Sequence, residues 1–599
     1  MSFLRVIPGI ETLSCFANIL NPFPVSPELA NWLRIPAPSI PSHEYWDRGT
    51  AVEWSKSMIG LCTHEHSHLK ENFRPKRLID IQTSPIRLLK SEALESPVTY
   101  VALSYCWGSE LDSQAQLRTD SDEMEEQLSL GFDEKRLPAV VRDAVEVSRS
   151  LSIPYLWVDA LCIRQDKPSV SDWEEHAGIM HRIYGNAYLT IAATCSSSCN
   201  EGFLRRKEPA VYLKYRSTLR HSMTGLLKMT FQYAHHSAFR KLDLSIQHKT
   251  ASYAAETFAR SKWSTRGWTF QEHISSTRIL AFGFKGNIFF SCPVGYWCFG
   301  REREASELRY TRQLGLDWSS FATDPSTGLS GWWWIVSAYS DRSRGFTNEG
   351  DIFPALSGIA RSYSTVVNIP ETDYIAGFWR PSLLRDLFWF SANHFNDKPW
   401  SQMNLLESRA SQDFVSPSWR RFYCGYSYPC ISACQNLTLK SEYQRMDTRI
   451  VHKGEDLLGA ISAAELHIVG KMARAPCDRI LRVNVRRRLP GDVQPWTPDL
   501  KGGHPWHFYL DWRPQQDPAD FSEVYMLLMA SFDLIKRDQS GGGGRGLLGL
   551  LLLRLPSDST EGSRFRRAGV FRTATRIPQP LGSGMELFRE CADELLVVV

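Results

Sequence analysis

The fold is decided by two stretches of the chain, YVALSYCWGS (100–109) and LPAVVRDAVEVSRSLSIPYLWVDALCIRQDKPSVSDWEEHAGIMHRIYGNAYLTIAATC (137–195). Together they hold three apolar runs rich in β-branched and aromatic residues, separated by two segments of helical period. Strands that alternate with helices predict an α/β fold, in which crossover helices connect the strands of a parallel sheet.

The expected strands are short and almost wholly apolar, as strands covered on both faces should be. They cover residues 100–105, 155–163 and 188–193. The first helix is expected over 137–151, because its apolar residues recur at helical spacing. The second is expected to begin at Ser171, which has capping-box spacing to Glu174.

The carboxyl edge of this sheet is the expected ligand site, because open parallel sheets bind ligands outside the carboxyl ends of their strands. The polar residues of the two stretches gather at that edge. They are Ser104, Tyr105, Trp107, Gly108, Cys162, Arg164, Gln165, Asp166 and the run 194–198.

Five blocks of the sequence resemble the signature blocks of the heterokaryon-incompatibility (HET) domain of filamentous fungi. They are YVALSYCWG, LPAVVRDA, YLWVDALCIRQD, DWEEHAGIMHRIYGNA and, later, RGWTFQE, and they span residues 100–272. Shorter blocks outside this span also resemble recurrent blocks of such proteins. They are PKRLIDI (75–81), FPALSGIA (353–360), DYIAGFWR (373–380) and PSW (417–419).

The pattern along the chain predicts three parts. Residues 1–95 are an irregular N-terminal approach segment, 96–300 the HET domain, and 301–599 a mixed, β-rich C-terminal unit. In the last part, 547–555 is expected to be a buried strand. The arginine-rich run 564–567 is expected to be a solvated face or a strand edge.

The composition excludes some classes of function. A net charge of +4 over 599 residues is too mild to predict nucleic-acid binding. The N-terminus lacks the pattern of a signal peptide, and no apolar run approaches ~18 residues, so no membrane association is expected. The 13 cysteines are odd in number and scattered, which favours the reduced thiols of a cytoplasmic protein.

One short stretch has residue types that bind zinc, namely Cys62, His64, His66 and His68. The resemblance implies a second cysteine after them, but Leu69 stands in its place. An exposed histidine-rich turn is therefore the favoured interpretation, and no metal site is predicted.

Asp159 lies inside an apolar run, and a buried carboxylate must be paired or hydrogen-bonded. Its possible partners are Arg142, Arg164 and Arg266. Two interpretations stay open: a polar anchor in a ligand pocket, or a structural ion pair or a carboxylate that accepts backbone N–H bonds.

Three further residues of the edge have two interpretations each. Gln165 could bind an amide or hydroxyl of a ligand, or could cap a loop. Tyr105 and Trp107 could stack on a flat ring, or could cover the end of the sheet. Cys162 is not expected to be a nucleophile, because a thiol buried in a strand is normally inert.

Three carboxylates are candidates for catalysis. Glu174 and Glu175 open the second helix, where a capping box and the helix dipole are the structural alternative. Glu201 follows the third strand.

The segment KWSTRGWTFQE (262–272) gathers a cation, indoles, an amide and a carboxylate, and is expected to begin a helix against the core. Arg266 could bind a phosphate or pair with Asp159, since arginine suits both. The candidate ligand-binding residues of this segment are Arg266, Trp268, Gln271 and Glu272.

The resemblance implies a role in fungal non-self recognition, in which fusion of genetically different hyphae triggers programmed cell death. The HET domain is similar to TIR domains, some of which cleave NAD with a glutamate near the ligand edge. The first hypothesis is therefore a TIR-like enzyme with NAD as substrate, and no other cofactor is implied. The alternatives are a non-enzymatic module that signals through self-association or a protein partner, and an inactive paralogue.

Overall fold

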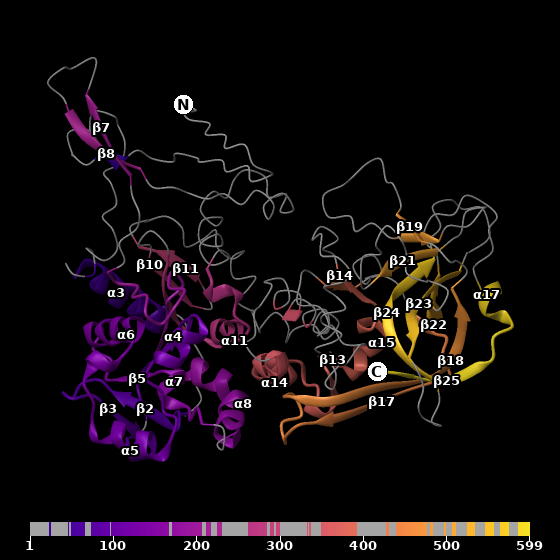
Figure 1. Ribbon diagram of the computed structural model, residues 1–599, viewed down its shortest axis with the longest axis horizontal. Helices are drawn as coiled ribbons and strands as arrows, with labels where there is room; N and C mark the ends of the chain where they lie inside the picture. Colours follow the sequence, from indigo (N-terminus) through magenta and orange to yellow (C-terminus); the bar gives the residue numbers. More distant parts are fainter. Residues whose placement is uncertain are drawn as a thin grey trace. The chain divides into compact units, whose positions relative to one another are not determined.

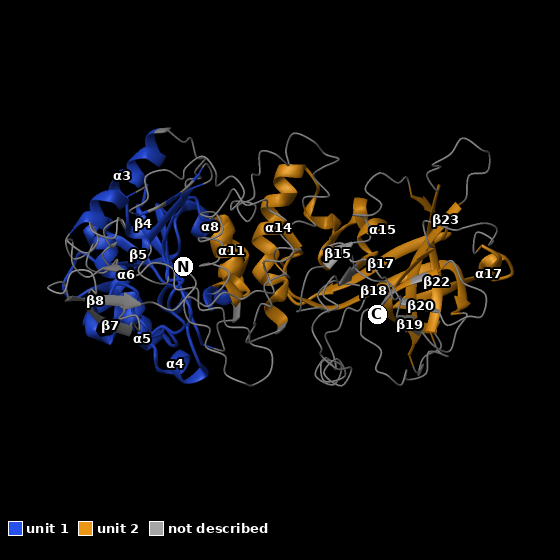
Figure 2. Ribbon diagram, turned by 90° about the horizontal axis from the view of Figure 1, so that it is seen from above, with its two compact units in different colours: residues 1–173, 183–263, 276–315 blue, residues 174–182, 264–275, 316–599 orange. Residues whose placement is uncertain are grey.

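The computed structural model describes residues 23–24, 46, 49–65, 73–95, 97–166, 170–205, 211–216, 224–229, 261–283, 288–292, 295–299, 332, 335–336, 339, 349–391, 427–429, 439–475, 480–482, 496–498, 506–510, 524–533, 545–555, 563–573 and 585–599. The chain forms two compact units, shown in blue and orange in Figure 2. The first comprises residues 1–173, 183–263 and 276–315, and the second comprises 174–182, 264–275 and 316–599.

The described part of the first unit is built on an eight-stranded sheet of order β11-β10-β9-β6-β4-β5-β2-β3 (Figure 1). Its strands are β2 (Arg77–Asp80), β3 (Arg87–Lys90), β4 (Tyr100–Ser104), β5 (Tyr155–Trp157), β6 (Leu189–Ala192), β9 (Ile279–Phe282), β10 (Ile288–Cys292) and β11 (Gly295–Cys298). The four central strands β9, β6, β4 and β5 are parallel, whereas the outer strands pair antiparallel.

The parallel centre confirms the α/β expectation. Every residue of β4 and β6 is buried, because helices cover both faces of a parallel sheet. The crossover helices are α6 (Ala139–Ser150) and α8 (Val170–Asn186). Because the described α8 begins at Val170, Ser171 lies within the helix and not at its N-cap.

The order of the strands creates a switch point. β5 and β6 lie on opposite sides of β4, so the connection that leaves β4 and the one that leaves β6 run in opposite directions. Right-handed crossovers then place α6 and α8 on opposite faces of the sheet. The loops that follow β4 and β6 diverge at their carboxyl ends, where doubly wound sheets bind ligands.

The expected second strand is wrong beyond Trp157. β5 ends there, and Asp159–Cys162 form the short helix α7, in which the N–H of Cys162 donates to the carbonyl of Val158 at 2.7 Å. Both conformations suit a short buried apolar run, and its hydrophobic pattern does not distinguish them. Asp159 therefore begins a helical turn and is half-buried, not a fully buried strand residue.

The other helices of the first unit are short or peripheral. They are α3 (Thr50–Glu65), α4 (Glu110–Ala115) and α5 (Asp122–Leu130). A separate described sheet contains β1 (Phe23–Pro24), β7 (Val211–Arg216) and β8 (Thr224–Met229).

The second unit is β-rich, as expected. Its described ten-stranded sheet contains β16 (Lys440–Ser441), β17 (Arg445–His452), β18 (Ile461–Arg474), β19 (Ile480–Arg482), β20 (Trp496–Pro498), β21 (Trp506–Leu510), β22 (Val524–Asp533), β23 (Arg545–Arg554), β24 (Ser563–Thr573) and β25 (Asp593–Val598). The expected strand at 547–555 is confirmed by β23.

Helices and small two-stranded sheets complete the described second unit. The helices are α11 (Trp268–Ser275), α14 (Pro354–Val367), α15 (Leu383–Asp386) and α17 (Glu586–Arg589). The small sheets pair β12 (Tyr374–Ile375) with β13 (Phe378–Trp379) and β14 (Trp389–Ser391) with β15 (Ser427–Pro429). The block PSW (417–419) lies outside the described residues.

The expectation of a solvated arginine cluster at 564–567 is wrong for Arg567. Its side chain is fully buried, with the guanidinium carbon 3.7 Å from the ring centroid of Trp389. It also donates to the carbonyl oxygens of Leu387, at 2.9 Å, and of Trp389. An aromatic face and two carbonyl groups together compensate for the lost hydration of this cation.

Candidate functional site

The loops after β4 and β6 meet at the switch point. The N–H of Cys199 donates to the carbonyl of Trp107 at 3.3 Å. Asn200 Nδ2 donates to Asp112 Oδ1 at 3.0 Å. We call the residues gathered here the edge cluster, which consists of Trp107, Gly108, Asp112, Asp159, Ser198, Asn200 and Glu201.

Gly108 lets the two loops approach closely. Its φ of +100° is strained for any residue with a side chain. A Cβ atom here would lie 2.6 Å from Asp112 Oδ2 and 2.7 Å from Ser198 Oγ. These direct contacts hold the two loops against each other at the switch point.

Asp112 is held as an anion. Its carboxylate accepts the backbone N–H of Ser109 at 3.0 Å and the Ser109 hydroxyl at 2.9 Å. These two bonds, followed by those from Asn200 and Ser198, lower the pKa of Asp112 to about 2. The same contacts form a capping box at the N-terminus of α4.

The side chains of Trp107 and Asp159 are hydrogen-bonded to each other. Trp107 Nε1 donates to Asp159 Oδ2 at 2.8 Å, and the other carboxylate oxygen accepts the N–H of Ala160 at 2.7 Å. Two of the expected arginine partners lie elsewhere: Arg142 donates to backbone carbonyls, and Arg164 pairs with Asp122 and Asp166. An indole and a carboxylate therefore stand together at the carboxyl edge.

The other predicted edge residues have structural contacts. Gln165 Nε2 donates to the carbonyls of Asp159 and Ile163, both at 3.1 Å, which is how a side-chain amide caps a loop. Tyr105 is buried and donates to Gln116 Oε1 at 3.1 Å, so its ring covers the core rather than facing solvent. Burial raises the pKa of Cys162 to about 12, which keeps that thiol protonated.

The three candidate catalytic carboxylates are all exposed. Glu201 accepts the N–H and the hydroxyl of Ser197, at 2.9 and 2.8 Å, and so belongs to the loop after β6. Glu174 and Glu175 lie on the part of α8 that groups with the second unit. Of the three, Glu201 alone is a member of the edge cluster.

The segment RGWTFQE also groups with the second unit, and α11 confirms that it begins a helix. Trp268 Nε1 donates to Asp351 Oδ2 at 3.1 Å. Gln271 is fully buried and accepts the N–H of Gly358 at 3.3 Å. Glu272 is also buried, and Arg266 is half-buried. These residues group with the second unit.

One arginine of α14 fixes the middle of α8 within the second unit. Arg361 donates to the carbonyl of Gly178 at 2.9 Å, to Glu371 at 3.1 Å and to Asp456 at 2.6 Å. The two helices cross at Gly358, where a Cβ atom would lie 2.6 Å from Nδ1 of His181 and 2.7 Å from its Cβ. Glycine thus permits the crossing.

An ion network that the sequence did not predict lies beside the edge. Arg77 is buried and donates to Glu125 Oε1 at 2.8 Å, to Asp172 Oδ2 at 3.1 Å and to the carbonyl of Cys162 at 3.3 Å. Asp172 also accepts the N–H of Arg164 at 2.9 Å. The one indication of this network in the sequence is Arg77 itself, a cation at the start of the apolar run RLIDI.

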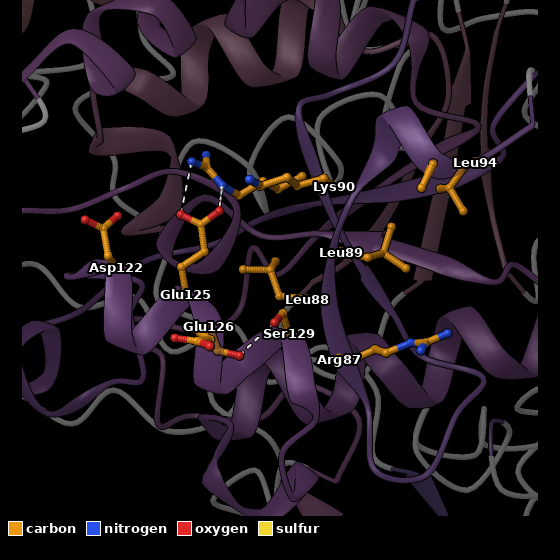
Figure 3. Close-up of a pocket in the computed structure, with 11 residues that line it drawn as sticks. Arg87, Leu88, Leu89, Lys90, Leu94, Asp122, Glu125, Glu126 and Ser129 are labelled. Atoms are coloured by element: carbon orange, nitrogen blue, oxygen red, sulfur yellow. Dashed lines mark hydrogen bonds and ion pairs between the residues drawn. The ribbon is translucent and has the colours of Figure 1, made fainter.

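A cavity of about 700 Å³ lies between β3 and α5 (Figure 3). It is lined by Arg77, Arg87, Leu88, Leu89, Lys90, Ala93, Leu94, Asp122, Glu125, Glu126 and Ser129. None of the predicted site residues lines this cavity. Arg77 and Glu125 of its lining belong to the ion network, and Asp122 pairs with Arg164. Its walls carry charges of both signs, which define no single ligand class.

The described residues contain no group of three His, Cys, Asp or Glu side chains that could hold a metal ion. The Cys62 thiol lies 3.2 Å from Nε of Arg278. His66 and His68 lie outside the described residues. No helix in the described part of the chain is both long and apolar enough to span a membrane.

Comparison with protein families matches residues 100–272 to the family described as heterokaryon incompatibility protein (HET). Comparisons with curated proteins and with solved structures gave no match. The matched span begins at β4 and ends within α11, so it contains the switch point, the edge cluster, residues 174–182 and the first part of 264–275. Residues 100–272 of the chain are therefore a heterokaryon-incompatibility (HET) domain.

Proposed function

We propose that this protein acts in fungal heterokaryon incompatibility, as a cytoplasmic signalling protein that responds to non-self and triggers programmed cell death. The match of residues 100–272 to the HET family supports this role. The signal passes by contact, through self-association or a protein partner, and not by turnover of a substrate.

The observation that favours signalling by contact is the direct hydrogen bonding of the two loops at the switch point. Hydrogen bonds between Trp107 and Cys199, and between Asp112 and Asn200, join the two loops between which a doubly wound sheet would hold a nucleotide. Of the candidate catalytic carboxylates, two are in the second unit and the third caps its own loop.

The route of the signal follows from the division of the chain. Residues 174–182 and 264–272 belong to the HET family match but pack within the second unit. Arg361 bonds to the first of these segments, and Gly358 contacts both. A change in the packing of the second unit would therefore reach the HET domain along the continuous backbone of α8 and α11.

A second candidate function is NAD cleavage by a TIR-like mechanism. The pairing of an indole with a carboxylate, Trp107 with Asp159, supports it, since such residues stack a base and bind a ribose. Glu201 is the carboxylate of the same cluster and would stabilise an oxocarbenium-like centre once the loops had separated.

The two candidates differ in what happens to NAD. We would induce the full-length chain in a fungal host, and follow viability and NAD content over time. Death with unchanged NAD supports signalling by contact. NAD loss that precedes death supports cleavage, and Glu201→Gln should then abolish both while the matched changes Glu174→Gln and Glu175→Gln leave them intact. Survival of every induced culture would contradict a role in cell death.

A further inference from the structure

Two buried thiols of the first unit lie side by side. Cys62 is on α3, Cys292 is the last residue of β10, and each is 1% exposed. The two elements pack against each other, and the two side chains share a hydrogen bond. The two cysteines are on opposite sides of the HET match, one before residue 100 and one after residue 272.

A cation stands beside this pair. Arg278 Nε lies 3.2 Å from Cys62 Sγ, and the same guanidinium donates to the carbonyl of Tyr188 at 3.3 Å. Arg278 is itself buried, so its charge acts on the thiol without screening by water. A buried cation next to a cysteine favours the thiolate, which is the form that attacks a disulfide.

We propose that Cys62 and Cys292 form a reversible disulfide bond when the protein meets a small disulfide oxidant such as oxidised glutathione. The bond would link α3 covalently to the central sheet. A transient disulfide of this kind fits a redox-responsive site in a compartment where thiols are otherwise kept reduced.

The chemistry takes two exchange steps. One cysteine, as thiolate, attacks a sulfur of oxidised glutathione, and the first glutathione leaves as a thiolate that takes up the proton lost by the cysteine. The second cysteine then attacks the mixed disulfide, and the second glutathione leaves in the same way. Two protein thiols lose two electrons and two protons, and one oxidised glutathione becomes two reduced molecules.

The resting pair is reduced and slow to react. The hydrogen bond with Cys292 and then burial raise the pKa of Cys62 well above its usual value, and these effects outweigh that of Arg278. Both thiols are covered, so an oxidant reaches them only when α3 separates from the sheet. Oxidation should therefore speed up with low concentrations of urea that open α3 without unfolding β4 and β6.

The test is peptide mapping of the full-length chain after oxidation. The protein is incubated with oxidised glutathione in low urea, remaining thiols are alkylated, and the digest is examined without reduction. We expect one peptide pair joined through Cys62 and Cys292, with the loss of two hydrogen atoms. It should vanish after reduction and in Cys62→Ser and Cys292→Ser, but persist in the matched control Cys106→Ser, another buried thiol.

A second readout does not depend on the variants. In oxidised wild-type protein, amide hydrogen exchange in α3 should be roughly tenfold slower or more, because the bond restricts the opened state. The half-buried Cys591 reports whether the oxidant acted. If Cys591 is modified while Cys62 and Cys292 are recovered alkylated, or joined to other partners, the proposal is wrong.

Discussion

Replacement of Arg77 by methionine should weaken the first unit, because Arg77 joins three elements of its core. The guanidinium bonds to Glu125 of α5 at 2.8 Å, to Asp172 of α8 at 3.1 Å and to the carbonyl of Cys162 at 3.3 Å. The side chains of Arg77 and Asp172 are 6% and 8% exposed. Methionine fills a similar volume but leaves two carboxylates without this cation.

The size of the effect follows from what remains. Removal of one partner from a buried ion pair costs about 3–5 kcal/mol. Asp172 keeps Lys76 at 2.8 Å and the N–H of Arg164 at 2.9 Å, while Glu125 keeps Arg164 at 3.6 Å. These contacts compensate in part, so we expect the low end of the range, about 3 kcal/mol.

Hydrogen exchange of the strand amides measures this loss in the intact chain, where two units make a single unfolding curve ambiguous. A loss of about 3 kcal/mol should speed global exchange of β2, β4 and β5 roughly hundredfold. The matched control is Arg87→Met, whose partner Asp80 lies at 3.4 Å and whose side chain is 51% exposed. It should change exchange less than about fivefold. Equal effects of both variants would refute the assignment of Arg77 as the centre of the network.

Three further predictions concern close contacts and one carboxylate. Gly358→Ala should cost about 1–3 kcal/mol, because its methyl would lie within 2.7 Å of His181 atoms, and exchange in 174–182 should rise. The control Gly60→Ala, in α3 with open space around it, should instead slow hydrogen exchange in α3. Slower exchange in Gly358→Ala together with faster exchange in Gly60→Ala would contradict the helix crossing. Gly108→Ala should separate the loops after β4 and β6, seen as faster exchange at 105–109 and 196–201, and unchanged exchange would contradict the close approach. Asp112 should titrate near pH 2 by carboxyl-carbon NMR. Since its pKa is depressed, its contribution to stability is full above the unfolded pKa of about 3.9 and is lost as pH falls through about 2; a midpoint near 4 would contradict the bonds to Ser109.

The parallel core could be predicted because its pattern is local. β4 and β6 are short apolar runs bounded by polar residues, and α6 has a clear apolar face with a proline before its first turn. The segment around Asp159 could not be predicted in this way. Apart from Asp159 it is apolar, so hydrophobicity alone did not distinguish the helix α7 from a longer β5.

The contacts of the site could be predicted only in part. The loop bonds of Gln165 were one of the two expected interpretations, because its partners lie a few residues away. The partners of Arg77 lie 48 and 95 residues along the chain, and no spacing rule connects them. Arg567 was expected in solvent, since nothing in RFRR indicates that Trp389 would cover it.

We propose that this protein, with its HET domain at residues 100–272, kills cells by signalling through contacts and not by consuming NAD. The most direct test is NAD content, measured in the same cells as viability, after induction of the full-length wild-type chain. We expect cells to lose viability while NAD stays at the level of uninduced cells. A fall in NAD before the first loss of viability would contradict it.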